Sequence, residues 1–379
     1  MRISRKDKAM AIVDEDLPED LLIDILSRLP AKSLVRFKSV SKYWYSLILN
    51  PNFISLHHTR AQPSYCVSIV SPIKNYPYNH CSMHLLPDQR SIHELDISFT
   101  GLRLRDSDMY RGCCDGLVCL AENTVTQSSI YSGIVICNPA TREFRPLPQP
   151  PYHQWRTRYV GFAFDSKTND YKVVRVATLR IPNTMLVDHN IQIYSMIADS
   201  WKEIATMAPG HDSTSYYHPC LSLEGIFYWL SYNLSAGVRA IDALNTVEGL
   251  FRQRALPGGV CSNSHSTLCL LNDSIAIAVP KYDNLHVETW FDIWLMEEFG
   301  VEEIWTKMYT IGPLLEICIP FGFGENSEVV LTWCQNGRIV KYNHCTDSME
   351  EYKQLCNLPK PMSITRVFPY SESLVPVKR

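Results

Sequence analysis

Residues 17–53 read LPEDLLIDILSRLPAKSLVRFKSVSKYWYSLILNPNF. Pro18 occupies a position that the first turn of a helix tolerates, and Glu19 and Asp20 follow it, where acidic side chains favour the helix dipole. At 100° per residue, the large apolar side chains that come next fall within an arc of about 140°. These side chains are Leu21, Leu22, Ile25, Leu26 and Leu29. The segment predicts an amphipathic helix with a broad apolar face that ends before Pro30.

Two further short helices are predicted at residues 33–40 and 42–49, and Trp44 and Ile48 share one face of the second before Pro51 interrupts the pattern. A module of about forty residues is near the size below which a domain usually needs a metal, a disulfide or a partner. The apolar face therefore packs among the three helices, caps a larger domain, or is buried against another protein. In the last case each large aliphatic side chain contributes roughly 1.5–3 kcal/mol to binding.

This run of residues resembles the F-box. The resemblance implies that the module docks a Skp-type adaptor, which links to a cullin that carries a RING subunit and the ubiquitin-conjugating enzyme. The residues that match the family pattern, and that the resemblance assigns to adaptor binding, are Leu17, Pro18, Leu21, Ile25, Leu26, Leu29, Pro30, Leu34, Val40 and Trp44. Packing of the third helix against the second is an alternative role for Trp44.

After residue 60 the helical spacing gives way to short apolar runs separated by Gly, Pro, Asn, Asp and Ser, which is typical of many short strands. One unit recurs, in which a strand meets a polar turn and the next strand begins with an aromatic residue. The five aromatic residues, 57, 50, 54 and 47 residues apart, are Phe144, Trp201, Phe251, Trp305 and Tyr352. A period of roughly 40–50 residues is expected of a propeller blade.

A sixth sheet is expected from residues 64–106, and the tail ITRVFPYSESLVPV at residues 364–377 is predicted to complete it and close the ring. Radial stacking of such sheets buries the apolar face that each would expose alone. We therefore predict an α+β multi-domain chain: a small all-α, three-helix F-box followed by an all-β, propeller-like domain of about six blades. The expected boundaries are 14–54 for the F-box, 55–63 for a linker and 64–377 for the propeller.

The long region resembles the F-box-associated domain of plant F-box proteins, which is similar to kelch-type propellers. The segments that carry this resemblance are GCCDGLVCLAEN, ICNPATREFRPLP, DYKVVRV and YSMIADSWKEI. The resemblance implies a substrate-recognition subunit of an SCF-type E3 ubiquitin ligase. The stretches YSMIADSWKEI and DIWLMEEFGVEEIWTKMYTIGP, with the ending YSESLVPV, also look like the S-locus F-box branch, whose members recognise pollen-rejecting ribonucleases.

Loops on one rim of the propeller are the expected place of target binding, because polar, aromatic and flexible residues gather there. The candidate loops cover residues 152–158, 183–190 and 210–217. The candidate target-binding residues are Tyr152, Trp155, Arg158, Tyr216 and Tyr217.

Composition narrows the function further. The 379 residues carry a formal net charge of -3, from 36 basic and 39 acidic side chains, which gives no long-range attraction to nucleic acid or to anionic membranes. The basic N-terminus has no apolar stretch typical of a signal peptide, so we expect a cytosolic or nuclear protein. The 13 cysteines show no zinc spacing and are expected to be reduced.

No motif for catalysis is present: the chain has no GxGxxG opening a helix, no phosphate loop, no HExxH and no GxSxG. We expect a non-catalytic adaptor without a cofactor or metal. Two alternatives stay open. One is a ligase-independent interaction propeller, and the other is a metal-dependent propeller oxidase, whose His, Tyr and Cys ligands would have to converge from different blades.

Overall fold

The fold is described from a computed structural model of the whole chain. The described residues are 18–61, 64–72, 79–88, 91–95, 110–121, 133–181, 183, 187–207, 220–233, 238–257, 266–271, 274–282, 288–299, 302–315, 318–323, 328–333, 339–343, 345–351 and 363–377. All structural statements below refer to these residues.

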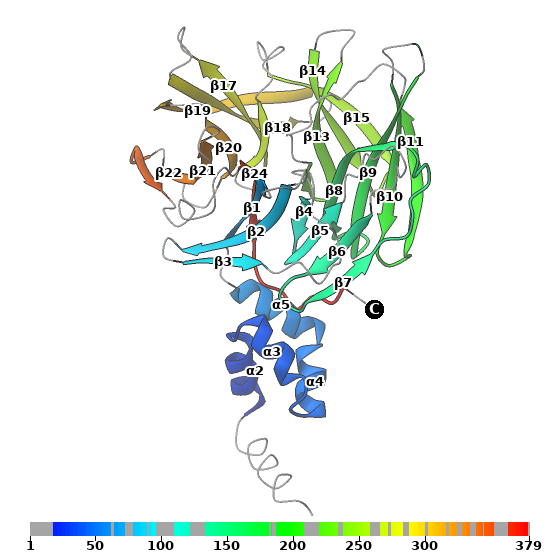
Figure 1. Cartoon of the computed structure of the whole chain (residues 1–379), viewed down its shortest axis with the longest axis vertical. Coiled ribbons are helices and arrows are strands. Elements are labelled where there is room, and N and C mark those ends of the chain that lie inside the picture. The colour runs from blue at the N-terminus through cyan, green and yellow to red at the C-terminus, as the bar shows by residue number, and fades with distance from the viewer. Residues whose placement is uncertain are drawn as a thin grey trace, which may run out of the picture.

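A helical module stands at one end of the molecule (Figure 1). Its helices are α2 (Glu19–Ser27), α3 (Ala31–Phe37), α4 (Lys42–Ile48) and α5 (Pro51–Arg60). The sequence predicted three of these helices. The fourth was missed because Pro51 was interpreted as the end of a pattern, whereas a proline at the first helical position starts a helix and Asn50 caps it, accepting from the Asn52 N–H at 2.8 Å.

The rest of the described chain forms six four-stranded antiparallel sheets. In spatial order the first is β24 (Ser363–Tyr370), β1 (Ser64–Pro72), β2 (Asn79–Asp88) and β3 (Ser91–Leu95). The second is β4 (Tyr110–Cys114), β5 (Leu117–Ala121), β6 (Ile134–Asn138) and β7 (Glu143–Pro146), and the third is β8 (Arg156–Asp165), β9 (Asp170–Arg180), β10 (Val187–Ser195) and β11 (Ser200–Met207). The fourth is β12 (Leu221–Leu223), β13 (Ile226–Asn233), β14 (Val238–Asn245) and β15 (Leu250–Ala255). The fifth is β16 (Thr267–Leu271), β17 (Ser274–Tyr282), β18 (Glu288–Phe299) and β19 (Glu302–Leu315), and the sixth is β20 (Cys318–Phe323), β21 (Glu328–Trp333), β22 (Ile339–Asn343) and β23 (Ser348–Glu351).

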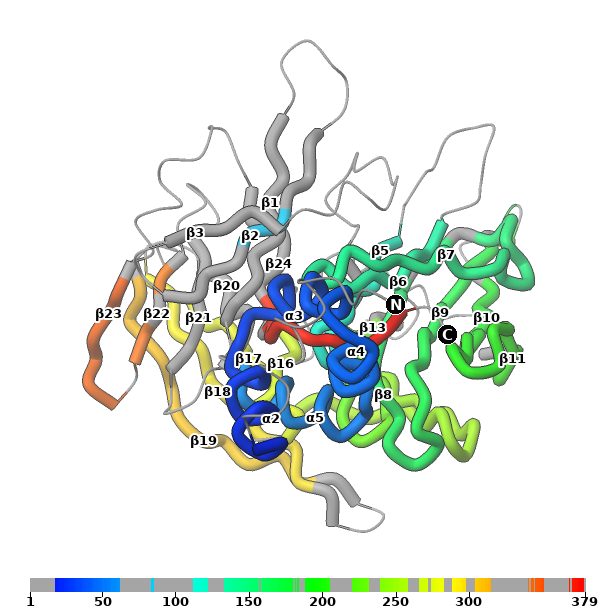
Figure 2. Tube along the Cα trace, turned by 90° about the horizontal axis from the view of Figure 1, so that it is seen from below, coloured from blue at the N-terminus to red at the C-terminus, as the bar shows by residue number. Residues whose placement is uncertain are grey.

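The C-terminal strand closes the ring, as predicted. β24 pairs antiparallel with β1, from Ser64 opposite Tyr370 to Val70 opposite Ser363. It also lies beside β4 and β20, the first strands of the two flanking sheets. Figure 2 looks from the helical end and shows the sheets spread around the module. The first sheet is thus built from both ends of the propeller region, so the ring needs its last strand to be complete.

The repeated aromatic residues occupy one structural position. Phe144, Trp201, Phe251 and Trp305 lie opposite Cys137, Tyr194, Leu244 and Met296 on the preceding strands. In the sixth sheet the residue in this register is Met349, opposite Tyr342. The sequence assigned Tyr352, which lies outside the described residues.

The turn before this position explains the register. A residue with positive φ lies two positions earlier in four sheets: Arg142, Asp199, Gly249 and Asp347. The turn residue and the aromatic ring each recur in four sheets, and in the sixth sheet the turn is present while Met349 stands where other sheets have an aromatic residue.

Side chains at the repeated position pack where two neighbouring sheets meet, and we call these contact regions the seams. Trp201 packs on a cluster that joins the second and third sheets, and Trp305 packs on one that joins the fourth and fifth. Each indole also reaches back to the preceding sheet: Trp201 Nε1 donates to the Pro148 carbonyl at 2.8 Å, and Trp305 Nε1 to the Ala255 carbonyl at 3.0 Å. These contacts fix the loops that leave β7 and β15.

Candidate functional site

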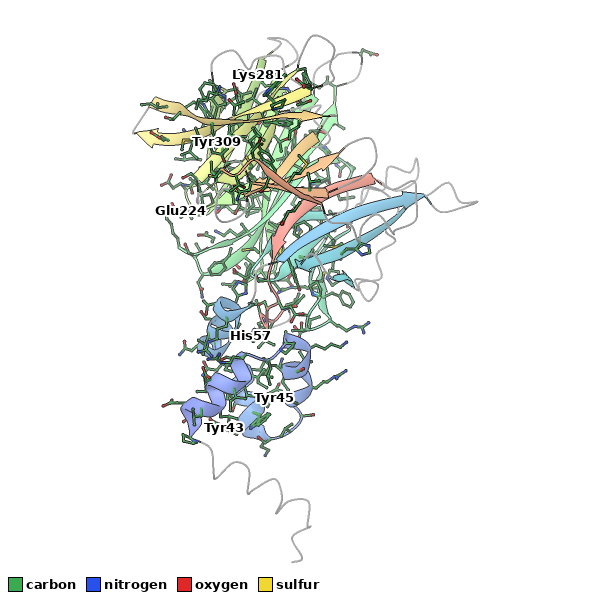
Figure 3. All side chains as sticks on the ribbon, turned by 90° about the vertical axis from the view of Figure 1, so that its left-hand side faces the viewer. Tyr43, Tyr45, His57, Glu224, Lys281 and Tyr309 are labelled. Atoms are coloured by element: carbon green, nitrogen blue, oxygen red, sulfur yellow. The ribbon has the colours of Figure 1, made fainter. Side chains whose placement is uncertain are left out.

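Exposed apolar side chains gather on the helical module. Leu21 and Ile25 lie one turn apart on α2 and are 52% and 48% exposed. On α4, Tyr43 and Tyr45 are exposed as well, and the Tyr43 hydroxyl donates to Glu19 Oε1 at 2.9 Å, which ties the start of α4 to the start of α2. Figure 3 shows Tyr43 and Tyr45 at the end of the module away from the sheets, whereas His57 is at the other end. We call these four residues the distal surface.

The structure separates the predicted adaptor-binding residues into three groups. Pro18 and Pro30 are exposed like Leu21 and Ile25, at the residues that precede α2 and α3. Leu29 and Val40 are partly buried. Leu17 lies outside the described residues.

Leu26 and Leu34 are buried in the core of the module, where they hold α2 and α3 together. Trp44 is partly buried and meets Phe37 edge-on, with ring centroids 5.4 Å apart, so it has the packing role proposed as its alternative. These three side chains support the distal surface from beneath.

Tyr43 and Tyr45 were not singled out from the sequence. The signal was present, because residues on either side of a buried helical residue point about 100° away from it. Since Trp44 packs inward, its two neighbours had to flank the buried face.

Polar contacts hold the helices in register. Ser41 caps α4 by accepting from the Trp44 N–H at 3.1 Å. Asp24 of α2 pairs with Arg28 at 3.0 Å and with Arg60 of α5 at 2.8 Å. The hydrogen bond from Arg28, with help from Arg60, holds the pKa of the Asp24 carboxyl below its usual value. The distal surface is thus carried by a small but well-connected scaffold.

A second candidate region is the loop between β7 and β8, which bears two predicted target-binding residues. Tyr152 is exposed with a φ of 50°, Trp155 is partly buried, and their ring centroids are 5.2 Å apart. The Glu203 carboxylate raises the pKa of the Tyr152 hydroxyl through its charge and a hydrogen bond. The structure therefore brings these two rings together.

Arg175 in β9 holds this loop from inside the protein. The side chain is buried, and it donates to the Trp155 carbonyl at 2.8 Å, the Pro151 carbonyl at 3.2 Å and Gln192 Oε1 at 2.8 Å. Gln192 Nε2 donates to the same Pro151 carbonyl at 2.8 Å. Buried, satisfied networks of this kind rigidify a segment. In the sequence, Arg175 stands out as a single charged residue within the apolar run VVRV, but the sequence alone predicted no role for it.

An open hollow of about 390 Å³ lies beside the loop. Its lining comes from Pro148, Gln149, Pro150, Pro151, His153, Asp199, Ser200 and Trp201. Arg158 lies near the start of β8, and its side chain is outside the described part of the structure. Tyr216 and Tyr217 lie outside the described residues, so the structure does not place them beside Tyr152.

No catalytic or metal-binding group emerges from the part of the chain that the structure describes. Within it, no three His, Cys, Asp or Glu residues lie close enough to hold a metal ion. Burial, together with the charge of Asp115, raises the pKa of the Cys114 thiol to about 12, and burial raises that of Cys137 to about 12. Such thiols are not nucleophiles at neutral pH. No helix among the described residues is long and apolar enough to cross a membrane.

In its described part the architecture defines a class of protein, namely a module of four helices with an exposed apolar end, mounted on a ring of six sheets. A model described as the F-box domain matches residues 15–56, and one described as the F-box associated beta propeller domain matches residues 73–377. The chain belongs to the family of F-box proteins with an F-box associated beta propeller domain.

Proteins with F-box names match this chain at low identity. F-box protein CPR1 of Arabidopsis thaliana is 26% identical over 364 residues, covering 86% of this chain and 82% of that protein. F-box/kelch-repeat protein At3g17530 of the same plant is 26% identical, covering 74% of this chain and 71% of that protein. Among solved structures, one of a nidogen/laminin complex aligns with a TM-score of 0.44 and 8% identity, covering 82% of this chain and 99% of that chain.

Proposed function

We propose that this chain is the substrate-recognition subunit of an SCF-type E3 ubiquitin ligase. F-box proteins are non-catalytic adaptors in such ligases, and a Skp-type adaptor connects them to a cullin and its RING subunit. In this proposal residues 14–54 dock the adaptor, residues 64–377 hold a target protein, and the protein acts in the cytosol or nucleus. The chain then works by proximity, raising the effective concentration of target lysines near the ubiquitin donor.

The observation that supports docking is the distal surface. Leu21 and Ile25 are half exposed on a module whose other end is packed against the propeller. Burying each of them in an interface is worth roughly 1.5–3 kcal/mol. Tyr43 and Tyr45 add aromatic side chains, which are typical anchors of protein interfaces.

Co-purification of the full chain with a co-expressed Skp-type adaptor tests this assignment. The variant Leu21→Asp/Ile25→Asp should weaken adaptor binding by about 3 kcal/mol or more, roughly 100-fold, because two buried apolar contacts become desolvated charges. A matched control is Val247→Asp/Leu250→Asp, which changes two equally exposed aliphatic residues of the fourth sheet. Equal adaptor binding by the two double variants would refute the docking assignment.

The propeller side of the proposal concerns the target. We assign target contact to Tyr152 and Trp155, with Arg158, Tyr216 and Tyr217 as further candidates, because the exposed Tyr152 and the partly buried Trp155 form an aromatic pair on a loop that Arg175 fixes. A narrower hypothesis follows from the likeness to the S-locus branch: the target would be a pollen-rejecting ribonuclease. Capture of such ribonucleases from pistil extract by the wild type, and not by Tyr152→Ala/Trp155→Ala, would support it.

The two alternative functions make different predictions. A ligase-independent interaction protein would bind targets but would recruit no cullin through the adaptor. A propeller oxidase would purify with stoichiometric metal. Cullin recovery in the adaptor experiment, together with metal analysis of the same sample, separates the three functions.

A further inference from the structure

The last residues of the chain connect the two parts of the molecule. After β24 ends at Tyr370, residues 371–377 run without regular secondary structure, and Figure 1 shows this red segment passing between α5 and the sheet that contains β7. We call residues 371–377 the C-terminal strap. Leu374 of the strap is 1% exposed and belongs to the core of the helical module, together with Leu26 and Leu34.

The strap also caps a helix of the F-box. α3 starts after Pro30 and has no side-chain cap from its own neighbourhood. Glu372 Oε2 accepts from the Ala31 N–H at 3.1 Å, across 341 residues of sequence. The first N–H groups of a helix need acceptors, and a carboxylate there also suits the helix dipole.

On its other side the strap is fixed to the second sheet. The buried Asn138 amide, at the end of β6, donates to the Ser373 carbonyl at 3.0 Å and to the Val375 carbonyl at 2.9 Å. Glu143 Oε2 of β7 accepts from the Val377 N–H at 3.1 Å. A segment anchored to a sheet on one side and to a helical core on the other transmits the orientation of one to the other.

The turn between β4 and β5 leaves room for the strap. Asp115 and Gly116 have φ values of 49° and 73°, as in a type I′ turn, where glycine is favoured at the second position. A methyl group at Gly116 would collide with Ser373 Cβ and would come within 2.6 Å of the Ser371 carbonyl oxygen. The strap therefore lies directly on this turn.

We propose that Glu372 and Leu374 are positioning residues, which hold the F-box helices at one angle to the propeller. A target on the propeller would then be presented at a fixed place relative to the ubiquitin donor, which raises the rate of transfer by proximity. The contribution to transfer rests on the proposed ligase function. The fixed angle itself does not.

Two glycines offer a matched pair of variants for the test. Gly116→Ala would displace the strap, whereas Gly225→Ala would not, because a methyl group there meets nothing closer than Asp165 Oδ1 at 3.4 Å. Both glycines follow an acidic residue in a tight turn, with φ of 73° and 79°, so both substitutions impose the same backbone strain. Any difference between the two variants reports on the strap.

The measurement is an electron–electron spin distance distribution on the full chain. Spin labels on non-natural residues introduced at Arg36 of α3 and Leu250 of β15, both exposed, avoid the native cysteines. We expect one narrow distribution for the wild type and for Gly225→Ala, and a distribution about twofold broader or more for Gly116→Ala. Equal widths for the two glycine variants would overturn the proposal.

A second set of variants guards against misfolding of Gly116→Ala. Glu372→Ala should broaden the distribution, and Glu372→Gln, whose side-chain oxygen still accepts from Ala31, should restore it. A narrow distribution for Glu372→Ala/Leu374→Ala would also overturn the proposal. Adaptor co-purification of the same variants is the separate readout of the ligase function. If even the wild type binds no adaptor, the docking assignment is wrong, and the distance distributions still test the fixed angle.

Discussion

His57 is an unusual residue, because it is a buried imidazole at the end of the module that faces the propeller (Figure 3). Its Nε2 lies 2.9 Å from the Leu29 carbonyl oxygen, whereas its buried Nδ1 has no hydrogen-bond partner among the described residues. Only a protonated nitrogen can donate to a carbonyl, so the geometry selects the neutral tautomer with the proton on Nε2. Charging the ring would place a second proton on a nitrogen without an acceptor.

Acidification should therefore lower the free energy of unfolding through His57, which lies at the end of the helical module that faces the propeller. Burial lowers the pKa of the ring, an effect to which the neighbouring His58 adds and which the Leu29 hydrogen bond and the Glu372 charge oppose. The pKa of His57 in the folded protein is below the unfolded value of about 6.5. The stabilisation that comes from burying the neutral ring is therefore complete above pH 6.5 and is lost as the pH falls through the folded pKa.

The measurement is urea unfolding at pH 7.5 and pH 5.5. The wild type should lose more free energy of unfolding between these pH values than His57→Gln, whose amide can still donate to Leu29 but does not titrate. Carboxyls with a lowered pKa, such as Asp24 and Asp292, lose their contribution only below their unfolded value of 3.8, outside this window. An identical pH dependence of the two proteins would contradict the argument.

At the level of single residues, periodicity predicted the apolar face of α2 but not which part of it is exposed. Leu21 and Leu26 belong to the same arc, yet one is exposed and the other is buried. The difference arises from α5 and from Leu374 of the C-terminal strap, which pack on the inner part of the arc. The pattern within residues 17–53 does not contain all of this information, because Leu374 comes more than 300 residues later.

At the level of elements, the turn that precedes the outer strand has the same chemistry in the second, fourth and sixth sheets. The side-chain oxygens of Asn138, Asn245 and Asn343 each accept two backbone N–H groups of the following turn. Asx turns of this kind initiate the chain reversal locally. They fix each of these turns by local hydrogen bonds. The side chain at the repeated position is then free to contact the neighbouring sheet.

The indole hydrogen bonds between sheets should contribute measurably to stability. Trp201→Phe and Trp305→Phe keep an aromatic ring but remove the N–H that reaches Pro148 and Ala255. Each variant should lower the free energy of unfolding by about 1 kcal/mol. The two seams are separate, so the double variant should lose about the sum of the two values, within roughly 0.5 kcal/mol.

Chemical denaturation of the four proteins measures these values. Tyr45→Phe is a control, since it removes a polar group from an exposed aromatic residue that lies outside the seams. A double variant as stable as the wild type would contradict the prediction. Hydrogen bonds from water would then replace the two indole hydrogen bonds without loss of free energy of unfolding.

The prediction of elements from sequence succeeded where the local signal was strong. Repeated turns and apolar runs predicted about six blades, and the structure confirms six sheets in its described part. The register of the sixth sheet was missed because the search followed aromatic residues, and that sheet has Met349 at the position concerned. A search for the Asn that starts the turn, six residues before this position in the second and fourth sheets, would have found Met349.

At the level of the whole molecule, the chain uses its C-terminus twice. β24 completes the first sheet, where Phe368 and Tyr370 are buried against Met83 and the second sheet. The strap that follows then fixes the helical module. Ring closure depends on residues 363–370, whereas residues 371–377 fix the helical module and also add the buried Val377 to the cluster of the second and third sheets.

Two truncations should separate these roles. Removal of residues 363–379 takes away a central strand of the ring, and the loss of Phe368 and Tyr370 alone costs roughly 3–6 kcal/mol of burial. That loss is a large share of the 5–15 kcal/mol that is typical of a folded domain, so the thermal unfolding transition should broaden or disappear. Removal of residues 371–379 should keep a cooperative transition of the sheets, at a lower temperature because the buried Val377 is lost, and should make α5 accessible to limited proteolysis.

Removal of residues 378–379 alone is the control for both truncations and should behave as the full chain does. Near-ultraviolet circular dichroism follows the aromatic packing of the ring, and mass spectrometry of the proteolytic fragments follows the junction. A cooperative, unchanged transition after removal of residues 363–379 would mean that the ring does not depend on β24. Resistance of α5 to proteolysis after removal of residues 371–379 would mean that the helices of the module hold their place without the strap.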